Sequence, residues 1–263
     1  MTSPPLILLG AQRSGTTALA SVLDSAFDEA GGVFTINGRL PYLLRRWCTD
    51  EDLRGRHLRV DEILHALHRK PPYGRHSQRW LTATEDVLRT AARDVACGAL
   101  PGTAEAGGAV ALRARLVRQA YASASRFGDK YNEYLLELDD LAATVPDGHW
   151  VLLVRHPADV AASVLRWSGD RPWRPPTWRA ALDKWAAWHE AWLRHPRAAD
   201  PRQSTVVEYG RLCAGEDLKR LSAAIDLDLE HHAGMLRRGG GGDAPPLPPS
   251  VAAVWEAVLE RRA

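Results

Sequence analysis

Residues 6–17 read LILLGAQRSGTT, and this stretch decides the fold. Leu6 to Leu9 form the continuous apolar run that is typical of a strand buried on both faces. Gly10 to Gly15 follow as a loop with two glycines, and beyond it apolar residues from Leu19 to Phe27 recur at i, i+3, i+4, i+7 and i+8. That spacing forms one stripe of a helix. The stretch therefore predicts a strand, a glycine-containing loop and a helix.

The rest of the chain extends this pattern to an α/β fold with a central parallel sheet flanked by helices. Gly31-Gly32 ends the first helix and Val33 to Ile36 reads as a second strand, which implies a right-handed crossover between parallel strands. Residues 40–145 are mainly helical in pattern, and about 40–127 are predicted to be inserted over the mouth of the sheet. Further strands are predicted at 150–154 and 204–208, and further helices at 157–167, at about 215–225 and from a cap at Ser250.

The bulk composition narrows the classes of function. The chain has 263 residues, 45% of them hydrophobic, and no clear linker, so we expect a single domain over 1–263. A net charge of +2 gives no reason to expect a nucleic acid or a membrane as partner. The three cysteines form no CxxC pair and no basic residue precedes the short apolar run, so neither a zinc site nor a signal peptide is predicted. A cytoplasmic protein is expected.

The loop between the first strand and the first helix has the features of an anion site. Its glycines let the backbone N–H groups converge, and the helix start adds unpaired N–H groups and the positive end of a dipole. Arg13, Thr16 and Thr17 add a charge and two hydroxyls, which an ordinary tight turn would not need. A Walker loop places lysine directly after its second glycine, but Thr16 stands there. The loop therefore suits an anion shorter than a nucleoside triphosphate, such as a phosphosulfate.

A second motif, WVLLVRHPADVAAS at 150–163, combines a buried strand with the start of a helix. Pro157 suits the first turn of a helix, and Asp159 complements the helix dipole. Arg155 stands at the carboxyl end of the strand, where α/β folds bind ligands, and Ser163 can face the same edge. The strand of a nucleoside triphosphatase would end in Asp, so the arginine favours an anion over a metal. A surface arginine beside a serine packed in a helix is the alternative.

These two motifs resemble those of sulfotransferases that use 3′-phosphoadenosine 5′-phosphosulfate (PAPS). Leu8 to Thr17 resembles their 5′-phosphosulfate loop, and Arg-x-Pro-x-Asp-x-x-x-Ser at 155–163 resembles their 3′-phosphate segment. The resemblance implies the P-loop-like sulfotransferase fold, PAPS as co-substrate without a metal, and sulfuryl transfer to a hydroxyl or amine, expected on a small molecule. The inserted helical region would then lie on the acceptor side. The donor-binding residues that it implies are Gln12, Arg13, Ser14, Gly15, Thr16, Thr17, Arg155 and Ser163.

Three further segments are similar to parts of the same family. Lys130 stands where many sulfotransferases place a catalytic lysine, although a solvated lysine at a helix start is an equal alternative. Tyr209 begins the segment Tyr-Gly-Arg-Leu, where relatives have Tyr-Glu-Asp-Leu, so Gly210 and Arg211 differ from the family pattern. The remaining segment begins with Arg237, Arg238 and Gly239 and is similar to the family's cover of the 3′-phosphate, while a flexible surface loop is the alternative.

The general base departs from the family pattern. Relatives use a Glu shortly after the second strand, or a His at the position of Asn132, and neither is present here. Asp129, Glu133 and the histidines at 57, 65, 68 and 76 stay as candidates, unless the acceptor is acidic enough to need little help. A P-loop kinase or nucleoside triphosphatase is the main alternative function, and a nucleotide-binding protein that has lost catalysis is another. The oligomeric state is not predicted.

Overall fold

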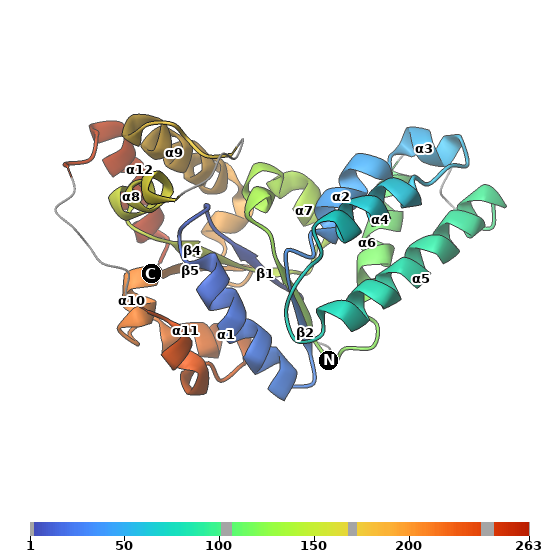
Figure 1. Ribbon diagram of the computed structural model, residues 1–263, viewed down its shortest axis with the longest axis horizontal. Helices are drawn as coiled ribbons and strands as arrows, with labels where there is room; N and C mark the ends of the chain where they lie inside the picture. Colours follow the sequence, from blue (N-terminus) through green and yellow to red (C-terminus); the bar gives the residue numbers. More distant parts are fainter. Residues whose placement is uncertain (1–2, 101–106, 168–172, 238–244, 263) are drawn as a thin grey trace. The chain divides into compact units, whose positions relative to one another are not determined.

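The computed structural model describes residues 3–100, 107–167, 173–237 and 245–262, and its fold is α/β (Figure 1). Parallel strands are flanked by helices, as the sequence predicts. The strands are β1 (Leu6–Leu9), β2 (Val33–Ile36), β3 (Phe127–Lys130), β4 (His149–Val154) and β5 (Ser204–Glu208). The described residues divide into two compact units.

The α-helices follow the same order along the chain. The first six are α1 (Thr16–Glu29), α2 (Leu40–Trp47), α3 (Asp50–Arg54), α4 (Val60–Arg69), α5 (Ser77–Ala96) and α6 (Gly108–Ala120). They are followed by α7 (Leu138–Thr144), α8 (Pro157–Arg166), α9 (Trp178–Arg194), α10 (Tyr209–Cys213), α11 (Leu218–Ile225) and α12 (Pro249–Glu260). The short 3₁₀ segments of the described residues are η1 (Asn132–Leu136), η2 (Pro196–Ala199) and η3 (Glu230–Met235). No helix of the described residues is long and apolar enough to cross a membrane.

The first unit, which we call the loop unit, comprises Leu6–Ala26, Asn132–Leu138 and His149–Ala263. In it β4 pairs in parallel with β1 on one side and with β5 on the other. Every residue of β1 and β4 is buried, which explains the apolar runs Leu6–Leu9 and 150–154 within them. Because the strands are parallel, Gly10 and Arg155, which follow β1 and β4, stand at the same edge of the sheet.

The second unit, the helical unit, comprises Met1–Pro5, Phe27–Tyr131 and Asp139–Gly148. It contains the parallel pair β2 and β3, together with α2 to α6, which accounts for the helical pattern of the sequence in this region. The ring of Tyr121 stacks on Phe127 of β3 with centroids 4.4 Å apart, and Phe27 packs edge-on against Phe34 of β2 at 5.3 Å. The prediction of a single domain over 1–263 stays a prediction.

Two sequence interpretations at the level of single elements are wrong, and one predicted helix begins later than expected. Residues 127–130 form β3 rather than the start of a helix, so Lys130 ends a strand. The helix expected at about 215–225 is shorter, at Leu218–Ile225, and a separate helix, α10, precedes it. The last helix begins at Pro249 with Pro248 as its N-cap, so Ser250 is not the cap. Proline has its φ already fixed near the helical value, which favours Pro249 as the first helical residue.

Candidate active site

The loop between β1 and α1 adopts a tight curl that its glycines permit. Gly10 has a φ of 156° and Gly15 a φ of 95°, both in the region that favours glycine. A Cβ on Gly10 would lie 2.6 Å from Thr16 Cγ2 and 2.7 Å from the main-chain oxygen of Leu153, so no larger residue fits there. Arg13 also has a positive φ, of 71°, which costs a non-glycine residue about 1–3 kcal/mol. Strained residues of this kind are enriched at ligand-binding and active sites.

Donor groups gather at this curl. Helix α1 begins at Thr16, and the first N–H groups of a helix have no partner within the helix. The hydroxyl of Ser14 is buried and has no hydrogen-bond partner in the part of the chain that the structure describes. A buried hydroxyl left unpaired is unfavourable, and an anion in the loop would accept its hydrogen bond. The residues of the loop therefore fit a bound anion.

Asn132, on η1, fixes the loop from the side. Its Nδ2 donates to the main-chain oxygen of Gly10 at 2.7 Å and to Thr16 Oγ1 at 3.2 Å. Because the Thr16 hydroxyl accepts this bond, its own hydrogen stays available for a ligand. Sequence reasoning treated position 132 only as a missing histidine and did not expect this contact. Next to it, Gln12 Nε2 donates to Glu133 Oε1 at 3.4 Å.

Arg155, which follows β4, lies beside Tyr209, and the sequence predicts that both residues bind the nucleotide. Its Nε donates to Asp159 Oδ2 at 3.4 Å, and its Cζ lies 5.5 Å from the centre of the Tyr209 ring. The side chain is 12% exposed, so the guanidinium is partly desolvated. Of its donors, only Nε has an acceptor in the described chain, which leaves the two terminal nitrogens for an anion.

The two sequence motifs meet at a hydrogen bond. Arg13 Nε donates to Ser163 Oγ at 3.0 Å, although 150 positions separate the two residues in the chain. The ring of Tyr209 lies against Gly15, so that a Cβ at this position would overlap it, and the same ring faces Arg155. The structure thus gathers two arginines, a serine and the loop at one edge of the sheet.

Tyr209 contacts both motifs from the end of β5. It is 8% exposed, and burial raises the pKa of its hydroxyl above the usual value, so the phenol stays neutral. That hydroxyl donates to the main-chain oxygen of Arg237 at 2.9 Å. Arg238 and Gly239, which were predicted to cover the 3′-phosphate, lie outside the described residues.

Lys130 and Asp129 lie at the end of β3 in the helical unit, and both are 3% exposed. Asp129 Oδ1 accepts from the main-chain nitrogen of Gly38 at 2.9 Å and from Thr35 Oγ1 at 2.8 Å, while Oδ2 accepts from the nitrogen of Arg39 at 2.7 Å. With both oxygens in use, the carboxylate holds the turn after β2. The description of Lys130 as a solvated lysine at a helix start is wrong, because it is buried at the end of a strand.

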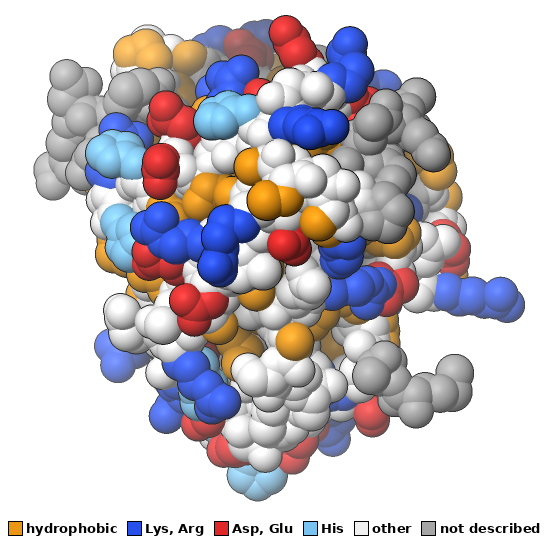
Figure 2. All heavy atoms as spheres, turned by 90° about the vertical axis from the view of Figure 1, so that its right-hand side faces the viewer, with side chains coloured by type: hydrophobic (Ala, Val, Ile, Leu, Met, Phe, Trp, Pro, Cys, Tyr) orange, Lys and Arg blue, Asp and Glu red, His pale blue; other side chains and the backbone are white. Residues whose placement is uncertain are grey.

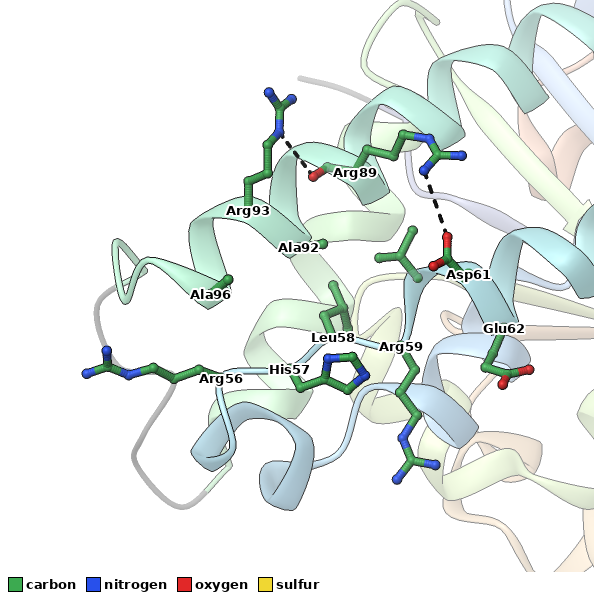
Figure 3. Close-up of a pocket in the computed structure, with 11 residues that line it drawn as sticks. Arg56, His57, Leu58, Arg59, Asp61, Glu62, Arg89, Ala92, Arg93 and Ala96 are labelled. Atoms are coloured by element: carbon green, nitrogen blue, oxygen red, sulfur yellow. Dashed lines mark hydrogen bonds and ion pairs between the residues drawn. The ribbon is translucent and has the colours of Figure 1, made fainter.

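The helical unit has a pocket of about 770 Å³ that holds none of these residues (Figure 3). Figure 3 shows Arg89 reaching toward Asp61, while Arg56 extends away from the pocket. Arg59 pairs with Asp52 at 2.8 Å and Arg89 with Glu85 at 2.8 Å, so much of the positive charge is balanced. Figure 2 shows basic and acidic side chains interspersed on the face that it draws. Among the described residues, no group of three His, Cys, Asp or Glu side chains could hold a metal ion.

Comparison with known proteins finds a protein family and solved structures that are similar to this chain. The family model described as the sulfotransferase family matches residues 4–230. The sulfotransferase domain from the Synechococcus PCC 7002 olefin synthase has 18% sequence identity and a TM-score of 0.56, over 98% of this chain and 93% of that chain. The sulfotransferase domain from the curacin biosynthetic pathway has 14% identity and a TM-score of 0.56, over 98% of both chains. At these identities the likeness shows the fold alone. A sequence comparison with curated proteins gives no match.

Proposed function

The chain belongs to the sulfotransferase family, and from this premise we propose that it transfers a sulfuryl group from PAPS to a hydroxyl or amine of a small-molecule acceptor. The hydrogen bond between Arg13 and Ser163 is the observation that carries the proposal. It joins the loop expected at the 5′-phosphosulfate to the helix expected at the 3′-phosphate. PAPS has anionic groups at both of these positions, which makes it a fitting ligand for both motifs at once.

The donor would be held at its two ends by different residues. Arg13, the hydroxyls of Ser14 and Thr16 and the loop amides would bind the phosphosulfate, with Gln12 and Thr17 beside them. Arg155 and Ser163 would bind the 3′-phosphate, where each hydrogen bond between charged partners is worth about 1.5–3 kcal/mol. Tyr209, Arg237 and the segment from Arg238 to Gly239 would lie around the nucleotide, as the resemblance implies.

Transfer would run in line. The acceptor oxygen or nitrogen attacks sulfur, the bond between sulfur and the bridging phosphate oxygen breaks, and the electron pair leaves on adenosine 3′,5′-bisphosphate. By analogy with phosphoryl transfer, catalysis depends mainly on positioning and on stabilising the growing charge. Arg13, the loop amides and Thr16 would stabilise that charge, and Lys130 keeps the same role as a proposal. Removing one such donor typically slows the reaction by about 10²–10³.

Glu133 is the better candidate for the general base. Asp129 is occupied by backbone donors, whereas Glu133 is only partly buried and contacts the loop through Gln12. The histidines at 57, 65 and 68 are exposed in the helical unit, and His76 contacts Asp28 at 2.7 Å. We therefore propose that Glu133 accepts the proton of the acceptor.

Calorimetry with purified protein tests the donor. The wild type should bind adenosine 3′,5′-bisphosphate, and far more tightly than ATP with magnesium. Arg155→Ala should weaken binding of the bisphosphate by roughly tenfold or more and change binding of adenosine 5′-monophosphate little. Arg166→Ala, an exposed arginine on the same helix α8, is the matched control. Equal losses for both nucleotides would overturn the role of Arg155, and tighter binding of ATP with magnesium would favour the kinase alternative.

A further inference from the structure

Lys184, on α9, contacts the loop that follows β1, although no sequence motif includes it. Its Nζ donates to Gln12 Oε1 at 2.7 Å and to the main-chain oxygen of Trp173 at 2.7 Å. The Gln12 amide donates in turn to Glu133 at 3.4 Å. One side chain of the loop is therefore held between α9 and η1, and the ammonium fixes which way its amide points.

Lys184 carries its charge at a partly desolvated position, where an uncharged side chain would pack at a lower cost in free energy. Burial lowers the pKa of the ammonium, and the charge of Glu133 acts in the opposite direction. Both hydrogen-bond acceptors of Lys184 are uncharged, and no carboxylate of the described residues forms an ion pair with it. The rings of Trp188 and Trp173 lie 4.9 and 5.8 Å from Nζ, which favours a cation at this point. Lys184 is half-buried, and a partly desolvated ammonium that no carboxylate of the described chain contacts directly costs stability, so its presence needs another reason.

A ligand would supply that reason. An ammonium has three N–H donors, and two have acceptors in the part of the chain described. The residue that Lys184 holds, Gln12, directly precedes Arg13 in the loop. The small pocket beside Gln12 and Lys184 is otherwise apolar, lined by Val160, Val164 and Trp188. In such surroundings the attraction between a cation and an anion is stronger than in water.

We propose that Lys184 is a second cation of the phosphosulfate loop: it positions the loop through Gln12 and attracts the 5′ end of the donor. The inference rests on the proposed function, because PAPS supplies the anion. It deepens that function by adding a residue outside both motifs. Two helices then hold the loop: α8 holds it through the hydrogen bond between Ser163 and Arg13, and α9 holds it through the hydrogen bond between Lys184 and Gln12.

The test compares two nucleotides on matched variants. Lys184→Met keeps the length of the side chain and removes its charge, and Lys219→Met makes the same change at an exposed lysine of α11 in the same unit. Lys184→Met should lose roughly tenfold or more in affinity for adenosine 3′,5′-bisphosphate. Its affinity for adenosine 3′-monophosphate, which lacks the 5′ group and is measured by competition, should stay unchanged. Lys219→Met should match the wild type for both nucleotides.

Thermal unfolding without nucleotide shows whether each variant folds. If Lys184→Met does not fold, Lys184→Gln replaces it in the same titrations. Lys184→Arg, which keeps the charge, should retain part of the affinity that the neutral variants lose. An equal loss for both nucleotides would mean a structural role, and no loss would mean no role; either result overturns the inference. If the wild type itself fails to bind the bisphosphate, the proposed function is overturned instead, so the two failures are distinguishable.

Discussion

Gly15 lies directly against the ring of Tyr209, and a Cβ at this position would overlap two carbon atoms of the ring. The contact joins the loop after β1 to the end of β5. Gly15→Ala should therefore destabilise the protein by more than a positive φ alone would explain, because the ring must move or the loop must open. Binding of adenosine 3′,5′-bisphosphate should weaken with it, since the loop amides lose their arrangement. Denaturant unfolding and calorimetry measure the two effects.

Gly215→Ala is the matched control for this prediction. Gly215 has a φ of 80°, close to the 95° of Gly15, but nothing lies within 4 Å of a Cβ placed there. It should lose about 1–3 kcal/mol of stability from the backbone alone and no nucleotide affinity. Combining Gly15→Ala with Tyr209→Ala should recover part of the loss, because the two changes are coupled. Additive losses would show that the ring is not the obstacle.

The two acids considered for proton transfer should respond differently to loss of charge. Asp129→Asn should lower the free energy of unfolding by about 1–3 kcal/mol, because an amide cannot accept from Gly38 and Arg39 with both of its ends. Glu133→Gln should leave stability nearly unchanged and slow sulfuryl transfer from PAPS. The slowing should be large for an aliphatic alcohol and small for p-nitrophenol, which ionises without help. A similar slowing for both acceptors would argue against Glu133 as the base.

The sequence predicted best where local pattern and tertiary environment agree. The strands β1 and β4 are wholly buried, and β1 and residues 150–154 of β4 are apolar, so their sequences identify them. In contrast, β3 reads Phe-Gly-Asp-Lys, and its last two side chains are buried although they are charged. Its pairing with β2 and the hydrogen bonds of Asp129 compensate for this burial, and neither is visible in a four-residue pattern.

The candidate site likewise contains contacts that the sequence predicts and contacts that it does not. The meeting of Arg13 and Ser163 follows from the rule that the carboxyl ends of parallel strands share an edge. Asn132 and Lys184 carry no such signal, because they contact the loop only through side-chain hydrogen bonds that span 116 to 172 positions of the chain. Only the packing of η1 and α9 brings them there.

A buried histidine on α9 should make stability depend on pH. His189 is fully buried and stacks on Trp185 with centroids 3.9 Å apart, and burial lowers its pKa from 6.5 to about 4. Below pH 6.5 His189 becomes protonated in the unfolded chain, whereas in the folded chain it stays neutral until the pH falls to about 4. The free energy of unfolding should therefore fall as pH is lowered through this window, by up to about 3 kcal/mol in all from this group.

His189→Phe should flatten that dependence, because phenylalanine fills the site without a proton to gain. The flattening should appear in denaturant unfolding at a series of pH values between about 7 and about 4. Part of the slope should remain, since burial also lowers the pKa of His149. His65→Phe, at an exposed histidine of α4, should leave the slope as in the wild type. A slope unchanged in His189→Phe would mean that the acid sensitivity of the fold arises from other groups, such as carboxylates whose pKa values are lowered by hydrogen bonds.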